Sequence, residues 1–264
     1  MKIIWLDRID STNSEALRRL PELDGPVVLA AREQTAGRGQ RGNRWFSEAG
    51  QNLTFSIVLQ FGRGTLQVPE AGLPESSSLN RLPALSTADA VWLNFLTANV
   101  VADFVSSLGV DCRIKWPNDL YAGRDKLCGM LIENSLDSGG VAASVIGIGL
   151  NMNQMEFSQL ARATSVARLT GGHYYLDESL EILVRRFEEA LPALFDPARR
   201  QALFASYTSR LFQKDVRARY HDLLTGREFD GIIRGVAPDG RLLLEDCLTG
   251  ASLLYRFKEV GYIL

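Results

Sequence analysis

The stretch from Lys115 to Glu133 constrains the fold more than any other, because it mixes several kinds of polar group with side chains typical of a protein core. The polar residues are Lys115, Asn118, Asp119, Lys126 and Glu133. The core-type residues around them are Ile114, Trp116, Leu120, Leu127, Met130, Leu131 and Ile132. An ammonium, an amide or a carboxylate beside a core loses hydration, which costs free energy unless the group finds a partner. We therefore expect this stretch to direct its polar groups toward a ligand.

A second unusual segment lies upstream, and we call residues 37–45 the glycine loop. It carries three arginines within seven residues, Arg38, Arg41 and Arg44, among three glycines. Guanidinium groups make bidentate contacts with phosphate or carboxylate, and glycines let the backbone close over such a group. A solvated hairpin tip is the ordinary alternative, because basic glycine loops are common on protein surfaces. Together the two segments indicate an anionic, phosphorylated ligand held under a loop.

The glycine loop also has the spacing of the dinucleotide fingerprint, with Gly37, Gly39 and Gly42 in a GxGxxG pattern. That fingerprint needs a helix that opens within it, because the pyrophosphate binds at the helix N-terminus. Here the next element is an alternating strand over residues 52–61, and no acidic residue stands near position 62 to hold a ribose. We therefore reject the Rossmann interpretation.

Composition disfavours several classes of function. The formal net charge of −2 provides no global basic field for nucleic acid. The N-terminus meets charge too early for a signal peptide, and no apolar run approaches the roughly 20 residues that a membrane helix needs. The three cysteines are widely spaced and form no CxxC pair, which fits a reducing cytoplasm. With only His173 and His221, a histidine triad or zinc site is improbable.

Hydrophobic periodicity divides the chain into two parts, which we expect to be domains of residues 1–212 and 213–264. The first part predicts strands at 3–6, 27–31, 52–61, 112–116, 127–134 and 142–150. It predicts helices at 11–20 and 92–108, and a helical pattern at 176–212 that Pro192 and Pro197 interrupt. The second part predicts four short strands, at 216–220, 228–236, 241–245 and 253–257, and therefore a small β-barrel. Residues 62–84 are rich in Gly, Pro and Ser and predict an exposed insertion.

The Ser-Thr-Asn segment at residues 11–13 is typical of a helix N-terminus, and Thr12 with Glu15 has capping-box spacing. Capping is the default explanation, although hydroxyls at such a position also suit a small polar ligand group. Gln34 follows the second predicted strand and could serve the same group. Gly147 and Gly149 interrupt an apolar strand, which usually means a bulge or the close approach of a ligand.

The polar residues after Trp116 have ordinary alternatives too. Lys126 by itself resembles a surface lysine, but it lies just before an apolar strand and could neutralise charge as a carboxylate attacks a phosphate. Asp119 could be a simple turn residue. Asn118 could cap that turn, or hold a phosphate oxygen or a magnesium-bound water.

Taken in order, five segments resemble the biotin–protein ligases, also called biotin–acetyl-CoA-carboxylase ligases. They are Ser11-Thr12-Asn13, Gln34 through Trp45, Lys115 through Asp119, Lys126 through Gly129, and Gly147 through Asn151. Each is weak alone, but all five at plausible spacing are highly specific. The resemblance implies an α/β fold with a mixed sheet flanked by helices, related to class II aminoacyl-tRNA synthetases. It also implies a small C-terminal barrel of the Src-homology-3 type.

The resemblance further implies roles for individual residues. The biotin-binding set would be Ser11, Thr12, Asn13, Gln34, Gly37, Arg38, Gly39, Arg41, Lys126, Gly129, Gly147 and Gly149, with Ser11, Thr12 and Gln34 on the ureido head. The nucleotide-binding set would be Arg38, Arg41, Trp45, Asn118, Lys126 and Asn151, with Trp45 on the adenine and the two asparagines by the phosphates. The catalytic residues would be Lys126, Arg38 and Asp119.

The implied chemistry has two steps. The biotin carboxylate attacks the α-phosphate of ATP, with Mg²⁺ carried by the phosphates and no metal cage of protein side chains, and gives biotinyl-5'-AMP and pyrophosphate. A lysine of a biotin carboxyl carrier protein then attacks the mixed anhydride, and AMP leaves. Asp119 would orient that amine. No protein nucleophile is required, which agrees with the missing histidine and cysteine constellations.

The same resemblance shapes the expectations about partners. Some relatives carry an N-terminal winged helix-turn-helix, whereas here the first motif already stands at Ser11, so we expect a catalytic form without sequence-specific DNA binding. We expect a cytoplasmic monomer or homodimer without membrane association. Two alternatives remain. A lipoate–protein ligase would prefer a longer apolar slot to ureido-binding hydroxyls, and a non-catalytic biotin sensor would have lost the lysine that stands here at Lys126.

Overall fold

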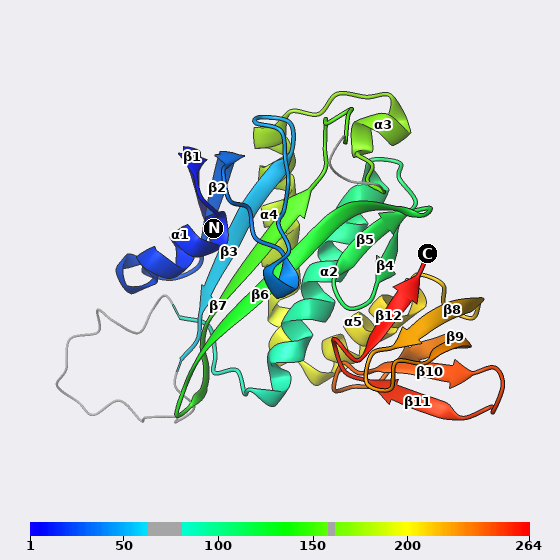
Figure 1. The fold of residues 1–264 in the computed structure, drawn as a ribbon. Coiled ribbons are helices and arrows are strands. Elements are labelled where there is room, and N and C mark those ends of the chain that lie inside the picture. Colours follow the sequence, from blue (N-terminus) through cyan, green and yellow to red (C-terminus); the bar gives the residue numbers. More distant parts are fainter. Residues whose placement is uncertain (63–80, 158–161) are drawn as a thin grey trace.

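The structure is a computed structural model that describes residues 1–62, 81–157 and 162–264 (Figure 1). Most of the insertion expected at residues 62–84 lies outside the described residues. Two sheets organise the rest. A large sheet takes strands from the first 150 residues, and a small sheet is formed entirely by the C-terminal segment.

The large sheet has seven strands in the order β1-β2-β3-β7-β6-β5-β4. Their bounds are Lys2–Ile9 (β1), Val27–Gln34 (β2), Leu53–Gln60 (β3), Arg113–Lys115 (β4), Asp119–Ala122 (β5), Asp125–Asp137 (β6) and Gly140–Leu150 (β7). Strands β1 and β2 run parallel, and every other neighbouring pair is antiparallel. The expected mixed sheet is therefore confirmed.

Helices cover both faces of this sheet, as expected. They are Thr12–Arg19 (α1), Val91–Ser107 (α2), Val166–Thr170 (α3), Leu176–Ala190 (α4) and Pro197–Ser209 (α5). Alternate residues of one strand pack on opposite sides of the sheet. In β2, Val28 belongs to the main core with α2 and α4, whereas Val27 and Leu29 join a second, smaller cluster with Ala16 of α1. Helix α1 therefore lies on one face, and α2 and α4 lie on the other.

Strand β3 shows the expected alternation of apolar and polar residues, yet all eight of its residues are buried. The odd-numbered residues, such as Phe55 and Ile57, enter the main core. The even-numbered Thr54 and Ser56 lie on the α1 face, and their hydroxyls are satisfied within the protein. Polar alternation on this strand therefore marks a buried polar layer under α1 rather than a solvent-exposed face.

Helix α2 is the central core helix. Buried residues surround most of the helix, because it packs between the large sheet, α4 and α5. The helical segment Ala88–Ser107 is long and apolar enough to cross a membrane by length and composition, so the expectation that no such segment exists is wrong. Most of this segment is buried inside the protein, which explains its apolar composition.

The small sheet is antiparallel, with five strands in the order β11-β10-β9-β8-β12. Its strands are Arg217–Asp222 (β8), Glu228–Val236 (β9), Leu242–Asp246 (β10), Ser252–Tyr255 (β11) and Val260–Ile263 (β12). This arrangement is consistent with a Src-homology-3-like unit and adds β12 to the four expected strands. The small sheet lies beside the β4–β5 end of the large one, where Trp116 donates from Nε1 to the carbonyl of Gly240 at 2.9 Å (Figure 1). The division at residue 213 stays a prediction.

Three further details differ from expectation. The four-residue β5 and the five-residue α3 were not anticipated, since elements this short carry little periodicity. The capping box at α1 is absent. The N-cap residue is Ser11, its side chain makes no capping hydrogen bond, and Glu15 pairs with Arg18 instead. The Thr12 amide is satisfied by Gln34 of β2, so tertiary contact replaces the local cap.

Burial predicts how the three cysteines react. Burial raises the pKa of the Cys112 thiol to about 11 and that of Cys128 well above its usual value, whereas Cys247 is half-exposed. Since the thiolate is the reactive form, an aromatic disulfide reagent at pH 8 should label one thiol of the native protein quickly. The other two should react only after unfolding in guanidinium chloride. Rapid labelling of two or three native thiols would contradict this burial pattern.

Candidate functional site

A cavity of about 330 Å³ opens on the α1 face of the large sheet. It collects most of the residues that the sequence singled out. Those that line it are Ser11, Thr12, Asn13, Gln34, Arg38, Gly39, Trp45, Asn118, Asp119, Lys126, Gly129, Gly147 and Gly149. Segments more than 100 residues apart therefore contribute to one site. The small sheet also takes part, through Val260, Gly261 and Tyr262 of β12.

Two predicted residues that the structure describes, Gly37 and Asn151, do not line the cavity. Gly37 lies at the base of the glycine loop, where its carbonyl accepts from the Trp45 amide at 2.9 Å. The side chain of Arg41 lies outside what the structure describes. Asn151 is buried and donates from Nδ2 to the Thr164 carbonyl at 2.9 Å.

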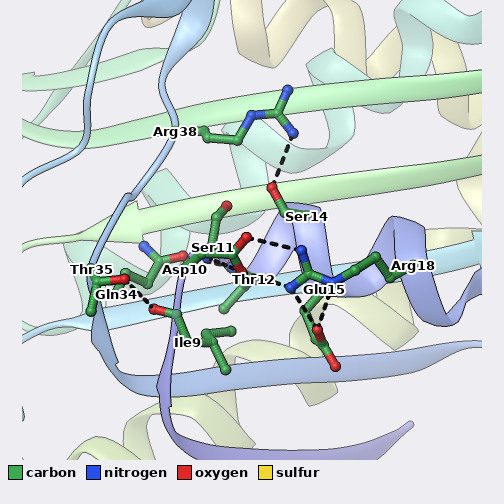
Figure 2. A network of polar contacts seen from close by, with 10 residues as sticks. All are labelled: Ile9, Asp10, Ser11, Thr12, Ser14, Glu15, Arg18, Gln34, Thr35 and Arg38. Carbon is green, nitrogen blue, oxygen red and sulfur yellow. Dashed lines mark hydrogen bonds and ion pairs between the residues drawn. The ribbon is translucent and has the colours of Figure 1, made fainter.

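One end of the cavity, which we call the head end, is formed by residues 11–13 at the start of α1 together with Gln34. Gln34 Oε1 accepts from the Thr12 amide at 2.7 Å (Figure 2). Beside them Arg18 pairs with Asp10 at 2.7 Å, and this hydrogen bond lowers the pKa of the Asp10 carboxyl to about 2. The turn into α1 is thus held by the exposed Arg18–Asp10 ion pair on the surface and by Gln34 on the cavity side.

A buried polar cluster supports the head end from below. Ser56 Oγ lies 2.8 Å from Thr12 Oγ1 and 2.6 Å from Asn13 Oδ1. Asn13 Nδ2 donates to Glu133 Oε2 at 2.9 Å and to the Leu131 carbonyl at 3.3 Å. Ser56 was not among the residues selected from the sequence. The only sequence feature that could have pointed to Ser56 is its place as a small polar residue in the middle of a largely apolar strand.

The glycine loop is tethered above the head end. Arg38 Nη2 pairs with Glu133 Oε1 at 2.7 Å. Arg38 Nη1 also lies 3.5 Å from Ser14 Oγ (Figure 2). The loop itself is a hairpin, because the Gly39 amide donates to the Asn43 carbonyl at 2.7 Å. Glu133 thus joins the loop to Asn13, a role that was not assigned from the sequence.

Glycines on β6 and β7 make room for side chains of the site. A Cβ on Gly147 would lie 2.1 Å from Asn13 Oδ1, and one on Gly149 would lie 2.3 Å from the Trp45 indole. Side chains of the protein therefore approach these glycines closely, whereas the expected approach of a ligand stays a prediction. In this structure the approaching groups are Asn13 and Trp45. The indole Nε1 of Trp45 is buried and has no hydrogen-bond partner.

The opposite end, which we call the charged end, holds Lys115, Asp119 and Lys126. Lys126 Nζ pairs with Asp119 Oδ2 at 2.7 Å, and both side chains are about 30% exposed, at 31% and 27%. Lys115 Nζ lies 3.2 Å from the Tyr121 hydroxyl and 4.6 Å above its ring. Burial lowers the pKa of Lys115, although the Asp119 carboxylate opposes this shift. This end offers positive charge to an anion, with one carboxylate beside it.

Side chains that could act as metal ligands do not gather in this region. Within residues 1–62, 81–157 and 162–264, no group of three or more His, Cys, Asp or Glu side chains is arranged to hold a metal ion. The cavity therefore combines a hydrogen-bonding head end with a cationic charged end. It suits a ligand that carries a polar head at one end and an anionic group at the other.

Comparisons with known proteins are consistent with this geometry. The model of the biotin/lipoate A/B protein ligase family matches residues 5–151. The bifunctional ligase/repressor BirA of Escherichia coli is 33% identical over 242 residues, which are 90% of this chain and 67% of that protein. The biotin–acetyl-CoA-carboxylase ligase of Mycobacterium tuberculosis is 30% identical over 244 residues, 89% of this chain and 80% of the relative.

Solved structures show the same fold. The biotin protein ligase from Aquifex aeolicus in complex with biotin and ATP superposes with a TM-score of 0.67 at 23% identity. That match covers 97% of this chain and 99% of the Aquifex chain, so both the large and the small sheet are shared.

The glycine contacts generate a stability test. Gly147→Ala would drive a methyl group into Asn13 Oδ1, and this amide is held by Ser56, Leu131 and Glu133, so it moves only by breaking hydrogen bonds. We expect a loss of about 1–3 kcal/mol in the free energy of unfolding, measured in urea.

The matched control is Gly261→Ala in β12, where a Cβ would meet its nearest atom at 3.9 Å. We expect its free energy of unfolding to change by less than about 1 kcal/mol. Equal effects of the two substitutions would show that Asn13 is not confined as described.

Proposed function

This chain belongs to the biotin/lipoate A/B protein ligase family, and from that premise we propose that it is an ATP-dependent biotin–protein ligase. It activates biotin as biotinyl-5'-AMP and transfers the biotinyl group to a lysine of a biotin carboxyl carrier protein. The observation that carries this proposal is the two-ended cavity, with Thr12 and Gln34 at one end and the Lys126–Asp119 pair at the other.

The head end favours biotin over lipoate. A ureido group carries two N–H donors and one carbonyl acceptor, whereas the dithiolane of lipoate carries neither. Gln34 Oε1 is engaged by the Thr12 amide, so the Gln34 Nε2 group remains to donate to a ligand. A dithiolane would leave the polar groups of the head end unpaired, at a cost of about 1–3 kcal/mol for each buried group.

The charged end supports the first step. The biotin carboxylate and the α-phosphate are both anions, so their approach needs positive charge that is already in place. Lys126 supplies it from the floor of the cavity, and Arg38 supplies it from the glycine loop. Before substrate binds, each is neutralised by a carboxylate, Lys126 by Asp119 and Arg38 by Glu133. Magnesium enters with the phosphates of ATP.

The second step uses the Asp119 carboxylate, which loses its partner Lys126 during the first step. As Lys126 turns from Asp119 toward the α-phosphate, Asp119 becomes free to bind the incoming amine. A nearby negative charge raises the pKa of an amine, so we assign Asp119 to orientation rather than to proton abstraction. The acceptor class follows from relatives that are named biotin–acetyl-CoA-carboxylase ligases.

The nucleotide contacts divide into two groups. Trp45 and Asn118 line the cavity, and we propose that adenine packs on the indole face opposite Gly149. Asn151 supports the catalytic lysine from behind. Its amide donates to the Leu127 carbonyl at 3.0 Å, and its side chain holds Thr164, whose amide donates to the Lys126 carbonyl at 3.0 Å. We therefore assign Asn151 to positioning Lys126 rather than to the phosphates.

The function is tested by adenylate formation. With ATP and Mg²⁺, the purified chain should release pyrophosphate in the presence of biotin and not of lipoate. Lys126→Ala should reduce this rate by about 10²–10³-fold, because it removes a preorganised cation at the reacting phosphate. Lys2→Ala, at an exposed position of β1, is the control and should keep full activity. Pyrophosphate release with lipoate, or full activity of Lys126→Ala, would refute the proposal.

A further inference from the structure

Ser56 is completely buried in the middle of β3, and no step of the reaction uses it. We propose that Ser56 is a positioning residue that sets the hydrogen-bond polarity of the head end and thereby selects a ligand with an N–H donor next to Thr12. This inference deepens the proposed function and rests on it. It follows from the number of protons available in the cluster under α1.

The orientation of the Asn13 amide comes first. Its Nδ2 faces two acceptors, Glu133 Oε2 at 2.9 Å and the Leu131 carbonyl at 3.3 Å. A flipped amide would place oxygen against both acceptors, which is unfavourable. Asn13 Oδ1 therefore faces Ser56 Oγ, at 2.6 Å. Because an amide oxygen carries no proton, Ser56 must donate in this contact.

The direction of the second contact follows from the first. A serine hydroxyl has one proton, and that of Ser56 is already given to Asn13. The Thr12 hydroxyl, 2.8 Å away, must then donate to Ser56 Oγ. Thr12 Oγ1 is left with lone pairs only, so toward the cavity it can act solely as an acceptor.

Gln34 completes the pattern with the opposite polarity. Its Oε1 accepts from the Thr12 amide, so its Nε2 is the group left for a ligand. Thr12 and Gln34 thus present one acceptor and one donor side by side at the cavity. The complementary ligand group has an N–H adjacent to a carbonyl, as a cyclic urea does. Without the Ser56 hydroxyl, Thr12 could rotate and donate, and this discrimination would be lost.

Calorimetric titration with biotin tests the inference without requiring catalysis. Ser56→Ala should weaken biotin binding about tenfold, because it removes the acceptor that orients Thr12. In the adenylation assay the KM for biotin should rise by a similar factor, while the KM for ATP should stay within about twofold. The matched control is Ser144→Ala on β7, which also deletes a fully buried hydroxyl. That hydroxyl donates to Asn134 Oδ1 at 2.7 Å, and Ser144 does not line the cavity. It should change neither constant.

A double-mutant cycle separates orientation of Thr12 from general support of the fold. If Ser56 acts through Thr12, then Ser56→Ala should weaken biotin binding by less than about threefold in a Thr12→Val background, because no hydroxyl remains to be oriented. An equal loss in both backgrounds, or unchanged biotin affinity in Ser56→Ala, would overturn the inference.

Two results keep the conclusions distinguishable. Wild-type protein that adenylates biotin while Ser56→Ala binds it equally well would refute the role of Ser56 alone. Wild-type protein that neither binds nor adenylates biotin would refute the proposed function, and this inference with it. If Ser56→Ala does not fold, Ser56→Cys replaces it in the same titration. The thiol is a weak donor and acceptor, so an intermediate loss of affinity is expected, and wild-type affinity would overturn the inference.

Discussion

The carboxamide of Asn13 is the contact on which the site depends, because it bonds the start of α1 to residues of two strands that are distant along the chain. It links α1 to Ser56 of β3, and to Leu131 and Glu133 of β6. It also uses the space left by Gly147 of β7. Through Glu133 the same network reaches Arg38 and the glycine loop. A buried amide costs free energy unless its donors and acceptor are paired, so this residue holds four segments in one arrangement.

Charge is organised differently at the two ends of the cavity. At the head end the polar groups are neutral and, except for the half-buried Gln34, fully buried, and their hydrogen-bond directions are determined by their partners. At the charged end Lys126 and Asp119 remain about 30% exposed and form a pair that an anionic substrate can separate. A partly hydrated ion pair is weak enough to exchange partners, unlike a buried pair, whose separation leaves an uncompensated charge. One end can therefore be rigid and selective while the other changes partners during the reaction.

Much of the fold could be predicted because its long elements carry strong periodicity. Strands β2, β3 and β7 and helices α2 and α4 lie close to where hydrophobic patterns placed them. Short elements such as β5, α3 and β12 were missed, since a few residues cannot establish a period. The alternation on β3 was seen, but its polar residues belong to a buried layer. A pattern records which residues share a face and does not record what covers that face.

The sequence by itself determined the chemical groups of the site, because residues close together along the chain (Lys115 through Asp119, or the arginines of the glycine loop) form recognisable clusters. The tertiary structure alone decided which of those groups remain available to a ligand. The partners that settle this for Thr12 and Asn13 lie 22, 43 and 120 positions away along the chain. The direction of a hydrogen bond depends on what both groups already donate or accept. Such long-range pairing exists only after the sheet has brought its strands together under α1.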